Sequence, residues 1–184
     1  MRPATTADRE QVVATVVAAF ADDPAFTHFF GAAYAADAPT FAGNLFDARS
    51  AYSTVWVVEG GAAVAMWNPP GAADVDVTVG LSTGSRQRLA AYDAVVHPLT
   101  SAEPSWYLGV LATHPDQRGR RWGRLVMSAG LERARADRLP AYLETATQTN
   151  LAIYQASGWT VTDTVTVDSL DVHVLRHPAG VESR

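Results

Sequence analysis

One continuous stretch, residues 106–123 with the sequence WYLGVLATHPDQRGRRWG, constrains the fold more than any other part of the chain. Its first half, Trp106 to Thr113, is apolar and rich in aromatic and aliphatic residues, which is typical of a strand buried on both faces. Pro115 and Asp116 end that strand. The apolar residues that follow lie at the spacing of one helix face: Trp122, Leu125, Val126 and Ala129. The stretch therefore predicts a strand, a turn and a helix in direct succession.

The turn between this strand and helix has the features of a phosphate-binding site. Gly119 and Gly123 let the backbone approach a ligand closely. The free N–H groups of the first helical turn and the positive end of the helix dipole favour an anion there. Positively charged side chains surround the same point: Arg118, Arg120, Arg121 and Arg124. Because the net charge of −5 argues against a nucleic-acid partner, these arginines fit a small anionic ligand better.

Length and composition predict a single soluble domain over residues 1–184, long enough for a full core of sheet and helices. No apolar run approaches the roughly 20 residues of a membrane span. The N-terminus lacks the apolar core of a secretory signal, so we expect a cytoplasmic protein without a membrane partner. Cysteine is absent, which excludes disulfides and a covalent acyl-cysteine intermediate. The five histidines are scattered without paired ligand spacing, so no metal site is expected.

Hydrophobic periodicity predicts further elements on both sides of residues 106–123. Thr54 to Glu59 and Ala62 to Trp67 are typical of a hairpin with its turn at Gly60-Gly61. Other strands are expected over 141–145, 161–167 and 171–175, and helices from a cap at Thr6 and over 24–30, 39–52, 86–96, 122–138 and 150–158. The helix over 86–96 is expected to end at His97-Pro98. Because a helix joins the strands over 106–113 and 141–145, these strands are expected to be parallel neighbours.

A second motif lies near the end of the chain, where residues 150–159 are typical of a helix ended by Gly158 in a left-handed cap. Together, the two motifs resemble the GNAT superfamily of N-acetyltransferases. Residues 118–123 are similar to its acyl-CoA pyrophosphate loop, Gln/Arg-x-x-Gly-x-Gly/Ala, with Arg121 in place of the middle glycine. Residues 150–159 are similar to a motif that ends in Gly-Phe, with Trp159 in place of the phenylalanine. Segments over 19–24, 55–67, 103–108 and 140–145 resemble superfamily members that acetylate an antibiotic.

The resemblance implies an α/β (α+β) fold, in which a central mixed, mostly antiparallel sheet splays between its middle parallel strands and carries helices on both faces. Acetyl-CoA is then the acyl donor, with its pantetheine arm in the gap beside Leu111, Ala112 and Thr113. Because an extended amide chain pairs with an open strand edge, backbone groups of Leu111 and Thr113 are expected to bind the arm. Asn150 is expected either to hydrogen-bond the cofactor or to cap its helix. The pyrophosphate would be held by Arg118, Gly119, Arg120, Arg121, Trp122, Gly123 and Arg124.

Arg121 has two opposite expected effects on the binding of CoA at this loop. If its position needs a positive φ, arginine there costs on the order of 1 kcal/mol and reshapes the phosphate cradle, which weakens CoA binding. The added guanidinium also suits a contact with a phosphate.

The implied reaction is attack by a neutral amine on the thioester of acetyl-CoA, through an oxyanion that a backbone N–H near Leu111 stabilises. Tyr154 matches the tyrosine that the superfamily places beside the cofactor sulfur, and it is expected to protonate the departing thiolate. The alternative is that Tyr154 only packs. Glu144 is expected to act as base or to hold the substrate ammonium, because burying an unpaired carboxylate in an apolar strand is costly. Its alternative is an ion pair with a nearby arginine.

The aromatic cluster over 24–30 corresponds to a region that helps to close the acceptor pocket in such families. Phe26, His28 and Phe29 are therefore expected to contact the acceptor, although His28 alternatively only packs. We expect this acceptor to be a small molecule with a primary amine, such as an antibiotic, in resistance or self-protection. A protein or peptide amine is an alternative, and so is a non-catalytic module that binds acyl-CoA or has lost that ability. Monomer and homodimer both stay open.

Overall fold

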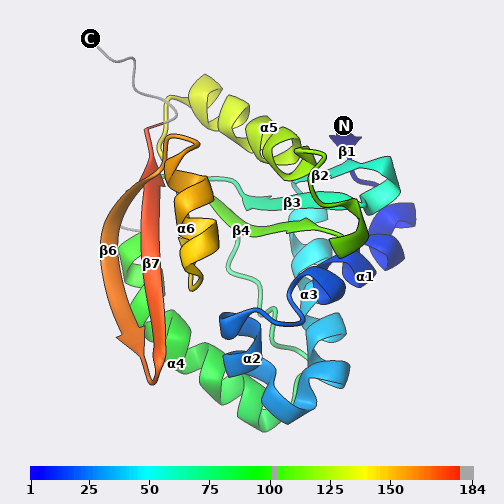
Figure 1. Ribbon diagram of the computed structural model, residues 1–184, viewed down its shortest axis with the longest axis vertical. Coiled ribbons are helices and arrows are strands. Elements are labelled where there is room, and N and C mark those ends of the chain that lie inside the picture. Colours follow the sequence, from blue (N-terminus) through cyan, green and yellow to red (C-terminus); the bar gives the residue numbers. More distant parts are fainter. Residues whose placement is uncertain (101–102, 179–184) are drawn as a thin grey trace.

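The computed structural model describes residues 1–100 and 103–178, which form a seven-stranded sheet flanked by helices (Figure 1). The stretch over 106–123 forms strand β4 (Trp106–Thr113) and leads into helix α5 (Trp122–Asp137), as expected. The other strands are β1 (Arg2–Pro3), β2 (Val55–Val58), β3 (Ala63–Asn68), β5 (Ala141–Thr145), β6 (Thr160–Val167) and β7 (Leu170–His177). The other α-helices are α1 (Arg9–Ala19), α2 (Pro24–Phe30), α3 (Tyr34–Ser50), α4 (Thr83–Thr100) and α6 (Gln148–Gln155). Residues 101–102 and 179–184 lie outside the described part, and a single domain over 1–184 stays a prediction.

The sheet has the strand order β1-β2-β3-β4-β5-β7-β6. Neighbouring strands are antiparallel except β4 and β5, which run parallel and pair only through Trp106 with Ala141 and Tyr107 with Tyr142. Beyond these pairs β4 and β5 separate, and in Figure 1 β3 and β4 cross the view while β6 and β7 run down its left side. The predicted mixed sheet that splays between its middle parallel strands is therefore confirmed.

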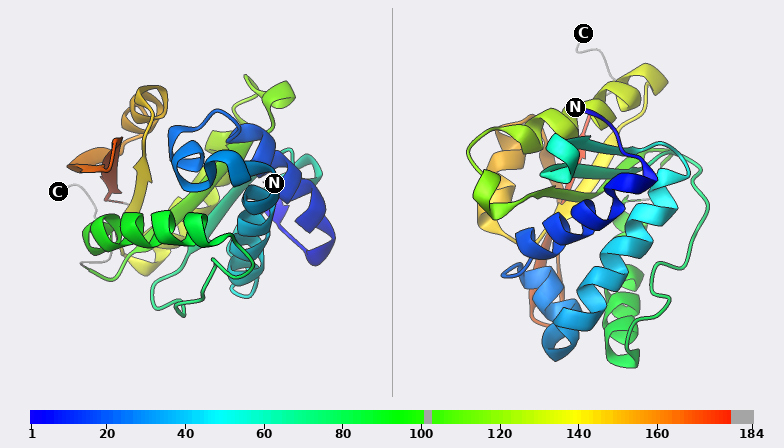
Figure 2. Two further views of the ribbon diagram at one scale, coloured as in Figure 1. Left: turned by 90° about the horizontal axis from the view of Figure 1, so that it is seen from below. Right: turned by 90° about the vertical axis from the view of Figure 1, so that its right-hand side faces the viewer.

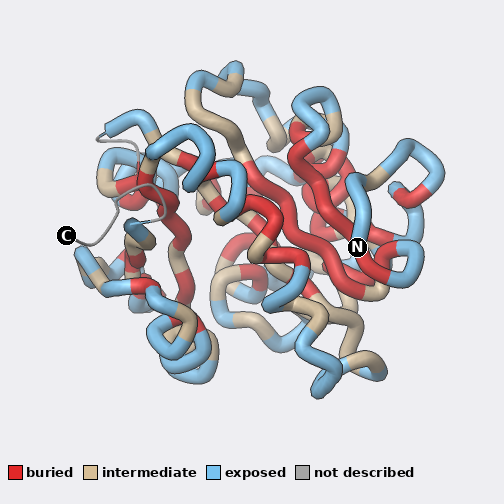
Figure 3. The backbone as a smooth tube through the Cα atoms, turned by 90° about the horizontal axis from the view of Figure 1, so that it is seen from above, coloured by how far each residue is buried: buried red, intermediate tan, exposed pale blue. Residues whose placement is uncertain are grey.

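Helices cover both faces of the sheet, and two apolar cores lie between them. On one face α5 packs over β2, β3 and β4, where Trp67 is fully buried. A Cβ on Gly130 of α5 would lie only 2.1 Å from the Trp67 ring, so this close approach requires glycine. On the other face α1 and α3 pack against β3, while α2 and α4 contact β7 (Figure 2). The buried backbone runs through the central strands, as Figure 3 shows.

Strand β4 contains a β-bulge that the sequence did not predict. Met66 pairs with Val110, but the next residue, Trp67, pairs with Leu108, so Gly109 is an extra residue on β4. Before the bulge, Trp106 and Leu108 pack into the core beside α5; after it, Val110 and Ala112 pack into the opposite core. The expectation of a strand buried on both faces is met in part: β4 packs into both cores, but every second residue is only partly buried. A bulge of this kind bends a strand and re-aims its side chains.

Several helix ends differ from the expected ones. Helix α4 does not stop at His97-Pro98 but includes Pro98 and ends at Thr100, because losing one backbone donor in the last turn is tolerable. There the Thr100 hydroxyl donates to the His97 carbonyl at 3.2 Å. Helix α3 begins at Tyr34, before the expected start at Pro39. A 3-10 turn over Thr6–Asp8 precedes α1, and Thr5 rather than Thr6 caps it, since the Thr5 N–H donates to Asp8 Oδ2 at 2.8 Å.

Candidate active site

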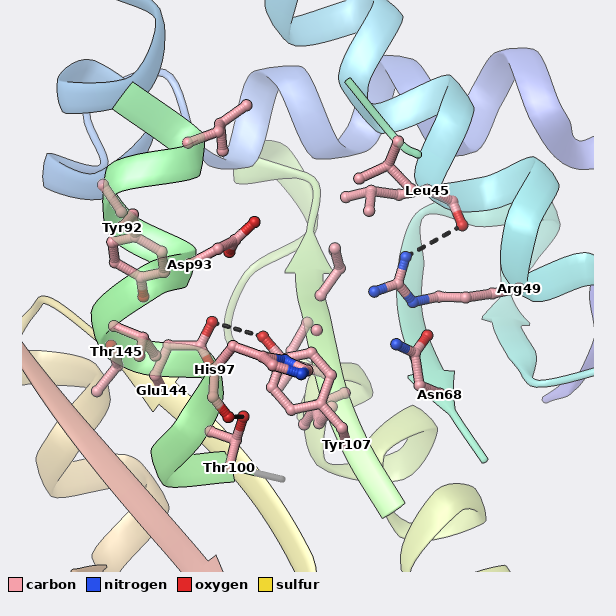
Figure 4. A pocket seen from close by; sticks show the side chains of 18 of the residues that line it. Leu45, Arg49, Asn68, Tyr92, Asp93, His97, Thr100, Tyr107, Glu144 and Thr145 are labelled. Carbon is pink, nitrogen blue, oxygen red and sulfur yellow. Dashed lines mark hydrogen bonds between the residues drawn. The ribbon is translucent and has the colours of Figure 1, made fainter. Parts of the chain in front are cut away.

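A cleft with a volume of about 1050 Å³ lies where β4 and β5 separate. Helices α2, α3 and α4 form its walls together with the segment 68–78, and β4, β5 and α6 contribute the remaining residues (Figure 4). The residues predicted from sequence that line this cleft are Phe26, Phe29, Leu111, Glu144, Asn150 and Tyr154. The splayed strands therefore bring together the two residues expected to carry the chemistry, Glu144 and Tyr154.

Glu144 lies on β5 and turns its carboxylate into the cleft. Its Oε1 accepts a 2.6 Å hydrogen bond from the Tyr107 hydroxyl, while its buried Oε2 has no hydrogen-bond partner among the described residues. Burial raises the pKa of Glu144 to about 7, and Asp93 raises this pKa as well. The Tyr107 hydrogen bond, the Tyr92 hydroxyl and the charge of Arg49 lower it only in part. A carboxyl group that titrates near neutral pH is suited to general-base work. The alternative of an ion pair with an arginine is not formed within the described residues; the direct partner is a phenol.

Tyr107 and Tyr92 complete the surroundings of this carboxylate. Burial raises the pKa of both phenols, and the negative charge of Glu144 raises them further, so both remain protonated at neutral pH. Two neutral phenols near Glu144 can donate hydrogen bonds but add no charge. Sequence reasoning missed them because each occurs in an apolar pattern, on β4 and on α4, where an aromatic residue is typical of core.

Arg49 is a further cleft residue that the sequence did not reveal. Its side chain extends from α3 into the pocket (Figure 4), and the residue is only 6% exposed. Its Nη1 donates to the Leu45 carbonyl at 3.3 Å, and its Nε has no partner among the described residues. Burial lowers the pKa of Arg49, although Tyr107 and Glu144 favour its charge. An arginine is common in the last turn of a helix, because its charge complements the helix dipole. The position of Arg49 in the sequence therefore did not mark it as a functional residue.

Tyr154 stands on α6 at the side of the cleft where the cofactor arm is expected. It is 9% exposed, and its ring contacts Trp159 edge-on at 6.1 Å between centroids. Burial raises the pKa of Tyr154, with a contribution from Glu144, so the phenol stays protonated and can donate a hydrogen bond. Asn150 does not cap the helix, because the cap is Thr147, whose hydroxyl accepts from the Asn150 N–H at 3.3 Å. Asn150 lies in the first turn of α6 and lines the cleft.

The expected phosphate loop lies apart from the cleft residues, between β4 and α5. Gly119 has φ 84° and Arg121 has φ 61°, so the position of the missing glycine does adopt the left-handed conformation. Arg118, Gly119, Arg120, Arg121 and Arg124 are exposed, while Trp122 and Gly123 are partly buried. The Arg120 guanidinium lies over the Trp122 ring at 4.9 Å. Arg121, the N-cap of α5, makes no side-chain cap hydrogen bond, so the first-turn N–H groups keep their capacity for an anion.

The strand edge beside this loop also suits an extended ligand. Strand β5 pairs with β4 only at Trp106 and Tyr107 within the described residues, so the part of β4 that contains Leu111 and Thr113 has no strand on that side. Leu111 lines the cleft, whereas the Ala112 side chain is 2% exposed and packs into the core on the other face. Ala112 can therefore contribute only backbone atoms.

The sequence predicted that His28 contacts the acceptor amine, but the structure places it outside the lining of the cleft. Phe26 and Phe29 line the cleft, but His28 does not, and its Nε2 lies 3.6 Å from Asp168 Oδ2 in the turn between β6 and β7. Its ring meets that of Phe29 edge-on at 5.8 Å. The cluster over 24–30 thus turns Phe26 and Phe29 toward the cleft and His28 toward the β6–β7 turn.

No group of three or more His, Cys, Asp or Glu side chains within 1–100 and 103–178 is arranged to hold a metal ion. No helix in the same part of the chain has both the length and the apolar character required to cross a membrane.

Solved structures with the same fold come from varied sources. A protein described as histone acetyltransferase HPA2 and related acetyltransferase from Corynebacterium glutamicum is 22% identical, with a TM-score of 0.72 over 99% of this chain and 97% of that chain. The C-terminal condensation domain of Ebony in complex with beta-alanyl-dopamine is 10% identical, with a TM-score of 0.75 over 95% of both chains. A putative arylalkylamine N-acetyltransferase 7 from the mosquito Aedes aegypti is 16% identical, with a TM-score of 0.70 over 95% of this chain and 84% of that chain. At these identities the likeness shows the fold alone.

The family assignment rests on the sequence match. The family model described as Acetyltransferase (GNAT) family matches residues 8–159, which span most of the chain and include β4, the loop after it, Glu144 and Tyr154. The splayed β4 and β5 and the left-handed residues of the loop agree with that match. This chain therefore belongs to the acetyltransferase (GNAT) family.

Proposed function

We propose that this protein transfers the acetyl group of acetyl-CoA to a primary amine of a small molecule. The observation that carries the proposal is the position of Glu144, whose carboxylate lines the cleft with a pKa near 7 and with one oxygen that has no hydrogen-bond partner among the described residues. A base with this pKa removes a proton from an ammonium group at physiological pH and still returns it to solvent afterwards.

Each remaining step has a residue suited to it. Bound acetyl-CoA supplies an activated acetyl group; the exposed arginines and first-turn N–H groups of residues 118–124 would hold its phosphates. Glu144 accepts the proton from the ammonium of the acceptor. A backbone N–H near Leu111 stabilises the negative charge that develops on the acetyl oxygen. Tyr154, protonated because burial raises its pKa, donates a hydrogen bond or a proton toward the departing sulfur.

The form of the cleft supports a small acceptor over a protein. Phe26, Phe29 and Phe41 line one part of the cleft, and Phe29 meets Tyr92 of α4 edge-on, with 4.9 Å between the ring centroids, so that aromatic side chains enclose this end. Such a walled pocket fits an amine that is buried on several sides, whereas a protein segment needs an open groove. The similar solved structures include a protein described as a histone acetyltransferase and a putative arylalkylamine N-acetyltransferase, so their names do not decide between a protein and a small-molecule acceptor.

The acceptor class that we propose includes antibiotic amines. Segments over 19–24, 55–67, 103–108 and 140–145 resemble puromycin N-acetyltransferase, and the last of these contains Glu144. On this proposal the protein serves resistance or self-protection in the cytoplasm.

The test is a thiol-release assay with acetyl-CoA and a panel of small amines that includes puromycin, together with a lysine-containing peptide. We expect turnover with a small amine and none with the peptide, and a loss of about 100-fold or more in kcat/KM for Glu144→Gln. Turnover of the peptide alone contradicts the small-molecule proposal. Binding of acetyl-CoA without transfer to any amine supports the non-catalytic module.

A further inference from the structure

The cleft contains a buried arginine that forms no direct ion pair with any carboxylate of the described residues. Arg49 is 6% exposed, and among the described residues its one direct hydrogen-bond partner is the Leu45 carbonyl, which accepts from Nη1 at 3.3 Å. Its Nε is buried without a hydrogen-bond partner among the described residues. The ion pairs of arginine within residues 1–100 and 103–178 are formed by Arg2, Arg9 and Arg176 instead. A buried unpaired guanidinium is costly and therefore needs an explanation.

The sequence makes room for this guanidinium in the wall of the cleft. A Cβ on Gly109 would lie 2.6 Å from Arg49 Nη2, so the extra glycine of the β4 bulge leaves the space that Nη2 occupies. Arg49 itself lines the cleft, and Figure 4 shows its side chain extending from α3 toward the interior. The bulge and the arginine thus fit together as one feature of the pocket.

Arg49 and the acidic residues approach the cleft from different walls. Glu144 comes from β5 and Asp93 from α4, while Arg49 comes from α3, with Tyr107 between them in Figure 4. A ligand bound beside Tyr107 can therefore meet the Glu144 carboxylate on one side and the planar Arg49 guanidinium on the other. Two N–H edges of a guanidinium match the two oxygens of a carboxylate, and this pairing is stronger than a bond to a neutral carbonyl.

We propose that the acceptor carries a carboxylate as well as its amine, and that Arg49 binds this carboxylate while the amine faces Glu144. The inference rests on the proposed function, because Glu144 marks the reactive end. It narrows the small primary amine of the proposed function to an amino-acid-like class. Within the amine panel, an acceptor with a carboxylate near its amine should therefore be preferred over puromycin, whose amine lies next to a neutral amide.

The test measures binding at this end of the cleft without any acetyl transfer. The probes are 3-phenylpropanoate and 3-phenylpropanamide, which share an aromatic ring for the wall at Phe26 and differ only in the carboxylate. Both are titrated into the wild-type protein by calorimetry or by NMR. We expect the carboxylate to bind at least about tenfold more tightly than the amide, and Arg49→Gln to remove this preference.

Two further variants keep the test decisive. Arg49→Lys keeps the charge but loses the planar fork, so it should retain only part of the preference. Gly109→Ala keeps Arg49 but places a Cβ where Nη2 lies, so it should also reduce the preference. Equal binding of the two probes, no binding of the carboxylate, or an unchanged preference in Arg49→Gln overturns the inference. Acetyl-CoA titration of the same samples reads out the proposed function separately, because the loop over 118–124 does not include Arg49.

Discussion

The Tyr107 hydroxyl donates a 2.6 Å hydrogen bond to Oε1 of Glu144, and the other oxygen of this carboxylate remains without a partner among the described residues. The bond fixes the carboxylate in the cleft and favours its charged form, while burial and Asp93 oppose that form. The balance gives a pKa of about 7. One phenol thus orients the group that we propose as the base and keeps its pKa within the physiological range.

The activity should follow the titration of Glu144. Below pH 7 the carboxyl group is protonated and cannot accept a proton, so kcat/KM should rise with pH and level off above about pH 7. The measurement is a pH profile of kcat/KM with acetyl-CoA and the best small amine. In Glu144→Gln this acidic limb should disappear together with most of the activity. A wild-type profile that is flat between pH 5 and 8 would show that Glu144 is not the base.

Tyr107→Phe should shift the same profile to higher pH. Loss of the hydroxyl removes a bond that lowers the pKa of Glu144, so the variant should be less active than wild type at pH 7 and should reach its plateau at a higher pH. Tyr34→Phe is the control, because it removes a partly buried phenol hydrogen bond, to the Val17 carbonyl, outside the cleft. A purely structural role of Tyr107 would instead lower kcat/KM by the same factor at every pH.

Glu144 should also make stability depend on pH. Its pKa is raised from 4.5 to about 7 on folding, so between these values the folded state binds more protons than the unfolded state. The free energy of unfolding should therefore fall as the pH rises from 4.5 to 7, by about 3 kcal/mol at most. Glu144→Gln should lose this dependence and be more stable than wild type at pH 8. Denaturant unfolding of both proteins at pH 5 and 8 measures the effect. If the free energies of unfolding of wild type and Glu144→Gln differ by the same amount at both pH values, the prediction is contradicted.

Gly130→Ala should destabilise the fold. A Cβ at this position would lie 2.1 Å from the fully buried Trp67 ring, so α5 and β3 would have to separate, at a cost of about 1–3 kcal/mol. Gly84→Ala is the control, since its Cβ would meet only the flexible end of Arg88 in helix α4. Thermal unfolding should show a clear decrease in Tm for Gly130→Ala and little change for Gly84→Ala. Similar Tm values for the two variants would mean that the contact with Trp67 relaxes without cost.

The predictable parts of this fold are those with strong local patterns. β4 and β5 begin and end where the sequence places them, because apolar runs between turn residues define buried strands. Helix α4 was predicted too short, because the packing of the helix outweighs the tendency of Pro98 to end it. The β4 bulge depends on the register with β3, which no single strand encodes.

The same distinction holds at the candidate site. Glu144 was found because a carboxylate in an apolar strand contradicts its surroundings. Tyr107 and Arg49 are both of a residue type that is usual in their local sequence, so only the folded structure, which places both in the lining of the cleft, identifies them. His28 shows the converse, because its place in the aromatic cluster did not decide which side of α2 faces the cleft.

Calorimetric titration with acetyl-CoA tests the account most directly, on the wild type, Arg118→Ala and Arg121→Gly. Arg121 already holds the left-handed φ of 61° that the loop requires, so the wild type should bind and Arg121→Gly should bind equally or more tightly. Arg118→Ala should bind about tenfold more weakly, because a charged contact with phosphate is lost. No binding by the wild type, with binding restored in Arg121→Gly, would contradict the acetyltransferase proposal and identify a module that has lost its donor.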